Sequence, residues 1–163
     1  MTGNRDRDRM VSPSDGESPF DRLGTATRSI ADLNQLSPAA LAYLGDAVYE
    51  LYIRSHYLFP PKRQKIYHQK VVEQVRAEAQ ARHLQSLEPY LSSSEIEIVR
   101  RGRNATFGKP KRIHPTIYRQ ATSLETLVGY LYLSDPLRLA ELLGKLDLDL
   151  DPLGSEANAK SQD

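Results

Sequence analysis

The sequence predicts an all-α protein, a compact helical bundle of one domain. Apolar residues recur at helical spacing through the middle of the chain, with Leu41, Leu44 and Val48 as the clearest run. A strong helix-start signal, Ser37-Pro38, stands just before that run. No segment alternates apolar and polar residues as a half-buried strand does. These three observations together favour helices throughout.

The first two helices are predicted from their apolar spacing and from the prolines between them. One helix is expected over residues 38–57, because Pro60 and Pro61 would stop it soon afterwards. A second helix is expected over residues 63–86, where Val71, Val75 and other apolar side chains keep the helical period.

A capping-box spacing predicts the third helix. Ser94 and Glu97 stand three residues apart, as the two side chains of such a box do, and the helix is expected to reach about residue 101. Two glycines and a proline then interrupt the pattern, so residues 102–114 are expected to form a loop.

Prolines mark the start of the two remaining helices. Pro115 precedes a run with Ala121, Leu124 and Val128 at helical spacing. Asp135 is placed to cap a last helix over residues 136–145.

Charge divides the 163 residues into three parts. Residues 35–146 carry a net charge of +6, whereas residues 1–34 and 147–163 carry −1 and −4. We expect 1–34 to be a disordered extension, 35–146 the folded domain and 147–163 a disordered acidic tail. A basic folded domain suggests a polyanionic partner.

Several classes of site and location are disfavoured. The chain has no cysteine, which excludes disulfides and thiolate metal sites. Its four histidines lack metal-ligand spacing, and no Gly-x-Ser-x-Gly motif is present. The N-terminus lacks the apolar stretch of a signal peptide, and no apolar run is long enough to span a membrane. We therefore expect a cytoplasmic protein without membrane contact.

Two carboxylates among apolar helical residues are the leading candidates for a site. Asp46 and Glu125 lie at the edges of two apolar stripes, and burying such groups is costly unless a partner compensates. A divalent metal is the obvious partner. Gly45 and Gly129 stand close to these acids and would let the two helices approach each other. The alternative is a solvated helix face or an ion pair between helices.

A run of cations is the second candidate site. Residues 100–112 contain six lysines and arginines and no acid, beside two glycines, which suits contacts to phosphate. The alternative is a loop that only adds solubility. The candidate RNA-binding residues in this run are Arg101, Arg103, Asn104, Lys109, Lys111 and Arg112.

The acidic helices resemble a known family. The stretch Leu44-Gly45-Asp46-Ala47-Val48 resembles the signature of the ribonuclease III catalytic domain, and residues 125–133 are similar to its second acidic motif. Residues 42–50, 101–104 and 118–122 are most similar to Mini-ribonuclease III, the short bacterial form. The resemblance covers about residues 35–146.

The resemblance implies a homodimeric, all-α endonuclease that cuts double-stranded RNA with Mg²⁺, or Mn²⁺ as a substitute. Asp46 and Glu125 fall on its catalytic, metal-binding positions, and Tyr43 on an aromatic position that packs into the partner subunit. The longer enzymes carry two further acids where this chain has Ala42 and Thr122, and the short form shares this sparser set.

The resemblance also implies a substrate. Enzymes of the short form mature the 23S ribosomal RNA precursor, and a large-subunit ribosomal protein is a further candidate partner. No double-stranded-RNA-binding domain is expected after residue 146, so the basic run and the dimer would hold the RNA. The alternative is an inactive RNA-binding or ribosome-assembly scaffold with the same fold.

Overall fold

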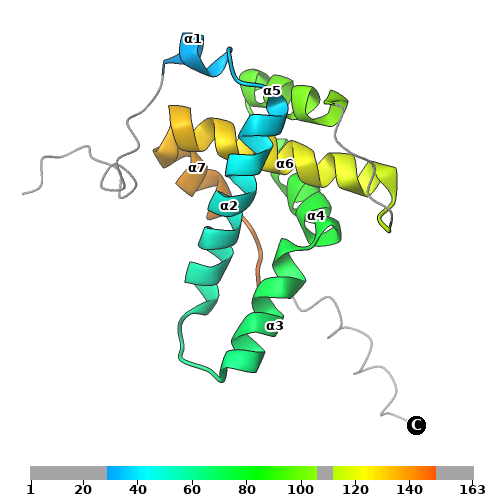
Figure 1. The fold of residues 1–163 in the computed structure, drawn as a ribbon. Helices are drawn as coiled ribbons and strands as arrows, with labels where there is room; N and C mark the ends of the chain where they lie inside the picture. The colour runs from blue at the N-terminus through cyan, green and yellow to red at the C-terminus, as the bar shows by residue number, and fades with distance from the viewer. Residues whose placement is uncertain (1–28, 106–111, 150–163) are drawn as a thin grey trace, which may run out of the picture.

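The computed structural model describes residues 29–105 and 112–149, and every regular element in this part of the chain is a helix (Figure 1). The all-α prediction is confirmed. None of the described helices is both long and apolar enough to cross a membrane. The disorder expected for the two ends concerns residues that lie mostly outside the described ranges. The elements are α1 (Ile30–Leu33), α2 (Pro38–Tyr57), α3 (Gln64–Val75), α4 (Ala77–Leu87), the 3₁₀ helix η2 (Glu88–Tyr90), α5 (Ser93–Asn104), α6 (Pro115–Ser134) and α7 (Pro136–Leu143).

Helix α6 is the central element, and α2 crosses it (Figure 1). Residues 121–124 and 126–129 of α6 are all buried, which covers every direction around a helix of 3.6 residues per turn. Both long helices begin where the sequence predicts. The Ser37 hydroxyl accepts a hydrogen bond from the Ala40 amide at 3.1 Å, and His114 Nδ1 accepts one from the Thr116 amide at 3.3 Å.

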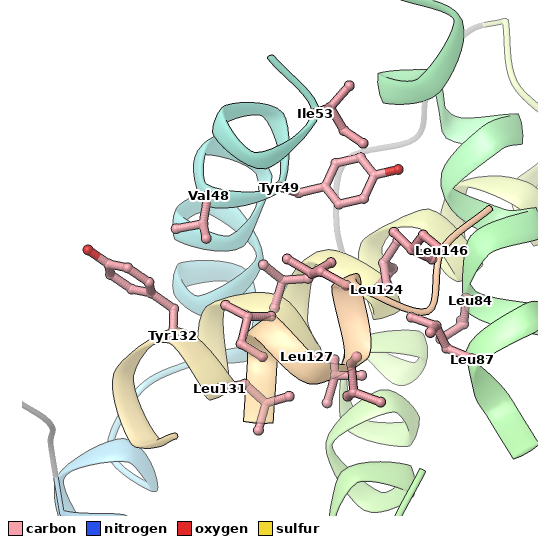
Figure 2. Close-up of a cluster of buried hydrophobic side chains, with 14 of the residues drawn as sticks. Val48, Tyr49, Ile53, Leu84, Leu87, Leu124, Leu127, Leu131, Tyr132 and Leu146 are labelled. Carbon is pink, nitrogen blue, oxygen red and sulfur yellow. The ribbon is translucent and has the colours of Figure 1, made fainter. Parts of the chain in front are cut away.

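The hydrophobic core lies between α2, α4 and α6 (Figure 2). Tyr49 and Ile53 of α2 are fully buried, and Leu84 of α4 and Leu124 of α6 pack into the same cluster. Each such side chain contributes about 1.5–3 kcal/mol by leaving water. The core therefore fixes how α2 and α6 cross, which is the geometry on which the two acidic residues depend.

The single helix expected over residues 63–86 is two helices. The chain is extended at Arg76, with φ −66° and ψ 151°, and α4 begins there, with the Gln80 amide donating to the Arg76 carbonyl. No proline or glycine marks this break. Packing causes it: α3 lies along the C-terminal half of α2, whereas α4 turns to pack on α6 (Figure 1).

The cap of helix α5 lies two residues before the predicted cap, Ser94, and the helix ends later than predicted. Its capping box is formed by Ser92 and Glu95, and it continues to Asn104. The predicted box pairs Ser94 with Glu97, whereas the observed box uses Glu95, whose side chain also contacts another helix. The Glu95 carboxylate pairs with Arg138 of α7 at 2.8 Å, and the Arg138 guanidinium lowers the pKa of Glu95. This partly buried pair selects the register of the cap.

The packed domain is slightly longer than the expected residues 35–146. Leu33 of α1 is buried at one end, and Leu148 is buried at the other. The Leu148 carbonyl accepts hydrogen bonds from the Tyr57 hydroxyl and from Gln74 Nε2. Residues that were expected to belong to the loose ends therefore complete the core.

Candidate active site

Asp46 and Glu125 come together because α2 and α6 cross at two glycines. A Cβ atom built on Gly45 would lie 1.8 Å from the carbonyl oxygen of Glu125, and one on Gly129 would lie 2.0 Å from that of Leu41. Neither position can hold any other residue without moving a backbone. The glycines thus permit the close approach that their positions in the sequence predict.

A pocket of about 300 Å³ opens beside this crossing, and both acids line it. We call it the carboxylate pocket. Within residues 121–129 of α6, every residue except Glu125 is buried. Glu125 is partly exposed, and it lines the pocket. Asp46 is exposed on the facing side of α2. The remaining walls come mainly from Ala42, Tyr43, Gln80, Tyr118 and Thr122.

The electrostatics of the carboxylate pocket favour a cation. Partial burial of its carboxyl group, and then repulsion from Glu50, raises the pKa of Asp46. Burial, followed by the charge on Asp46, raises the pKa of Glu125 to about 7, although a hydrogen bond from Gln80 opposes this. A buried carboxyl group whose ionisation is hindered by a second carboxylate gains most from a positive ion placed between the two.

Gln80 is a site residue that the sequence analysis missed. It lies on α4 and is only 2% exposed, yet it lines the carboxylate pocket. Its amide meets the Glu125 carboxyl, and its Oε1 has no hydrogen-bond partner. The available signal was a glutamine between Ala79 and Ala81 on an apolar face. Only the break at Arg76 turns that residue toward the site.

The donor set fits a hard divalent cation. Carboxylate and amide oxygens are the ligands that Mg²⁺ and Mn²⁺ prefer. Among the residues described, no cluster of three or more histidine, cysteine or acidic side chains could hold a metal. The site therefore offers two acids. Ala42 and Thr122, the two positions at which the resemblance noted a missing acid, both line the carboxylate pocket.

Tyr43 lies at the rim of this pocket. Its side chain is 87% exposed, the highest value among the large hydrophobic residues described. It lines the carboxylate pocket together with Asp46, which follows it by nearly one helical turn. An aromatic ring left in water beside a polar site suits contact with another macromolecule.

The candidate RNA-binding residues fall into three groups. Arg101, Arg103 and Asn104 belong to the end of α5 and not to a loop, because Gly102 packs against Ser123 and Thr126 of α6 and continues the helix. Arg112 is exposed. Lys109 and Lys111 lie outside the described residues.

A second hollow adjoins the carboxylate pocket. It measures about 460 Å³ and is lined by the start of α2 and by Arg100, Arg101 and Asn104 of α5. Ala39 lines both hollows. Arg100 pairs with Glu97, whereas Arg101 forms no ion pair with any described residue. A positive group and a helix N-terminus thus lie next to the two acids, an arrangement that suits a phosphate.

Comparison with known proteins places the chain among nucleases. The model of the Ribonuclease III domain matches residues 39–136. The chain is 56% identical to a Mini-ribonuclease 3 of Synechocystis sp. over 116 residues, which are 71% of this chain and 81% of that protein. It is 54% identical to a Mini-ribonuclease 3 of Synechococcus sp. over 123 residues, covering 76% and 89% of the two chains.

A solved structure agrees. A crystal structure of a protein from Fusobacterium nucleatum matches with a TM-score of 0.65 at 27% identity, and the match covers 69% of this chain and 94% of that one. The span matched by the domain model contains both acids of the carboxylate pocket.

Proposed function

The chain belongs to the ribonuclease III family, as a Mini-ribonuclease III, and is an endoribonuclease; from that premise we propose that it cleaves double-stranded RNA with Mg²⁺ and matures the 23S ribosomal RNA precursor. Mn²⁺ would be able to replace Mg²⁺. The observation that carries the proposal is the pair of carboxyl groups, Asp46 and Glu125, lining one pocket at the α2–α6 crossing.

In this proposal Asp46 and Glu125 are the catalytic residues and hold the metal. The bound ion would lower the pKa of a water molecule and offset charge on the phosphate. Asp46 is exposed and can meet the substrate side, whereas Glu125 is held in place by the packed stretches on either side of it. Water adds to phosphorus and the bond to the 3′ oxygen breaks, which leaves a 5′-phosphate and a 3′-hydroxyl.

We assign the RNA backbone contacts to Arg101, Arg103, Asn104, Lys109, Lys111 and Arg112. The hollow beside Arg101 and Asn104 supports this assignment, because it adjoins the carboxylate pocket at Ala39. Contacts of this kind recognise an A-form duplex by its shape, phosphates and 2′-hydroxyls. They do not require a particular sequence.

We further propose a homodimer with Tyr43 at its interface, acting in the cytoplasm. Two carboxylate pockets would then face the two strands of one duplex. The exposure of Tyr43 at the rim of the pocket supports the assignment. A large-subunit ribosomal protein would be a further partner during maturation of the precursor.

The first test is cleavage of a perfectly paired RNA with Mg²⁺ by the native protein and by Asp46→Asn. Metal catalysis contributes several kcal/mol, so the variant should cut at least about 100-fold more slowly. It should still bind the duplex. Asp32→Asn, the same change in exposed α1, is the matched control and should cut at the native rate.

Two results would contradict the assignment. Equal cutting by the native protein and Asp46→Asn would exclude Asp46 from the chemistry. Binding without cutting by the native protein, with Mg²⁺ and with Mn²⁺ and on the ribosomal precursor as well, would favour the scaffold.

A further inference from the structure

One buried polar atom in the site has no partner within the protein. Gln80 is 2% exposed, and its Oε1 is the only buried side-chain nitrogen or oxygen among the described residues without a hydrogen bond. An unpaired buried acceptor of this kind destabilises the folded protein. Buried polar groups are nearly always satisfied, so this one calls for an explanation in the chemistry of its surroundings.

The rest of the Gln80 side chain is committed to the carboxylate pocket. Its amide forms a hydrogen bond with the Glu125 carboxyl, which lowers the pKa of that group. The nitrogen donates in this bond, because an ionised carboxylate only accepts. The amide oxygen is therefore turned away from Glu125 and lies buried in the wall that Gln80 contributes to the pocket. The two acids are the other oxygen donors of that pocket.

A metal site formed by two acids is short of protein ligands. Mg²⁺ prefers six oxygens and keeps several of its waters when it binds a protein. Those waters donate hydrogen bonds and need acceptors. The unpaired Oε1 of Gln80 is a neutral acceptor in the same pocket, and it adds no further negative charge to the existing pair.

We infer that Gln80 is the third protein residue of the metal site: its Oε1 accepts a hydrogen bond from a water molecule of the cation held by Asp46 and Glu125, while its amide nitrogen keeps the Glu125 carboxylate in position. Gln80 is thus a positioning residue. This inference rests on the proposed metal-dependent function. It adds a ligand-orienting group to a pocket lined by two acids.

The test is Mn²⁺ binding by the full chain, measured from the electron paramagnetic resonance signal of free Mn²⁺ at an alkaline pH. Residues that support metal ligands typically contribute 10–100-fold to affinity. Gln80→Met should therefore bind Mn²⁺ about 10–100-fold more weakly than the native protein. Its metal-free melting temperature should be no lower, because the substitution also removes an unpaired acceptor.

Gln74→Met is the matched control. Gln74 is the other buried glutamine described, and its Nε2 donates to the Leu148 carbonyl at 3.3 Å, away from the carboxylate pocket. This variant should melt at a lower temperature and bind Mn²⁺ with native affinity. Gln80→Glu keeps an oxygen at the position but loses the amide nitrogen that donates to Glu125. It should bind Mn²⁺ more tightly than Gln80→Met.

The outcomes separate this inference from the proposed function. Native affinity in Gln80→Met, or an affinity in Gln80→Glu no higher than that in Gln80→Met, would overturn the role of Oε1 while leaving the two acids in place. Asp46→Asn should lose Mn²⁺ binding in the same assay. A native protein that binds no Mn²⁺ would overturn the metal-dependent function and the role of Gln80 together.

Discussion

Glu125 lies in a tightly packed helix and also lines an open pocket. Its neighbours on both sides are buried, and that burial, together with the charge of Asp46, raises the pKa of Glu125 to about 7. The metal-free protein therefore keeps the proton on Glu125 up to nearly neutral pH. A metal ion needs the ionised form and must displace that proton.

The first prediction concerns pH and metal affinity. Below about pH 7, where Glu125 is protonated, Mn²⁺ affinity should fall by about tenfold per pH unit, because one proton competes with the ion. Titrations of free Mn²⁺ between pH 5 and 9 would measure this slope. Affinity that does not change across neutral pH would contradict the role of Glu125 as a ligand.

Stability of the metal-free protein provides an independent check. A raised pKa contributes stability below the unfolded value of 4.5, and this contribution is lost as the pH rises through about 7. Burial lowers the pKa of His83 to about 4, and that group acts in the opposite direction, since its contribution is lost as the pH falls. The free energy of unfolding of the native protein should therefore be compared with that of Glu125→Gln at each pH. The contribution of His83 is the same in both proteins and cancels in the difference.

At the scale of the elements, the crossing of α2 and α6 depends on the absence of two side chains. The Cβ that Gly45 lacks would overlap the Glu125 carbonyl, which belongs to the backbone and cannot rotate away. The helices would have to move apart, and the core between them would lose its packing. Both the stability of the protein and the geometry of the carboxylate pocket therefore depend on this close contact between α2 and α6.

Gly45→Ala should destabilise the protein by about 3 kcal/mol or more, at or above the usual range for overpacking, because the clash is with backbone. Urea unfolding would measure the change. Gly144→Ala is the control: its Cβ would lie 3.2 Å from the nearest atom, at an exposed helix end, so the expected change is within about 0.5 kcal/mol. A mild Gly45→Ala would mean that the crossing is adaptable.

Local signals predicted the elements well where the chain itself decides them. The starts of α2, α6 and α7 follow from Ser37-Pro38, Pro115 and Asp135-Pro136, and all three are confirmed. The break at Arg76 could not be predicted, because it arises from α4 packing on α6. The same limit applies to the site. Spacing identified the acids and their glycines, but Gln80 reaches them only through that break.

At the scale of the whole molecule, the exposed surface beside the site combines groups of different chemistry. Tyr43 is 87% exposed at the rim of the carboxylate pocket, and Arg101 and Asn104 line the adjoining hollow. One face thus carries an uncovered aromatic ring, cationic groups and the two acids. Such a combination suits a surface that meets both a second subunit and a nucleic acid.

Tyr43→Ser should weaken the proposed homodimer by about 30-fold, the effect expected of a central aromatic residue at an interface. The fold of each subunit should be unchanged, because the ring contributes little to its own core. Sedimentation velocity over a range of concentrations would measure the association. Leu137→Ser, at a side chain 66% exposed on α7, is the control. A native protein that is monomeric at every concentration would contradict the dimer.

The burial of Leu148 has a practical consequence for anyone who trims the chain for crystallisation or NMR. Its carbonyl accepts from Tyr57 and from Gln74, which lie on two different helices. Cutting the gene at the codon for Leu146, where the last helix has already ended, would leave both donors without that acceptor and would uncover the side of the bundle. A fragment that keeps residues 29–149 retains both hydrogen bonds to the Leu148 carbonyl and the buried Leu33 at the opposite end.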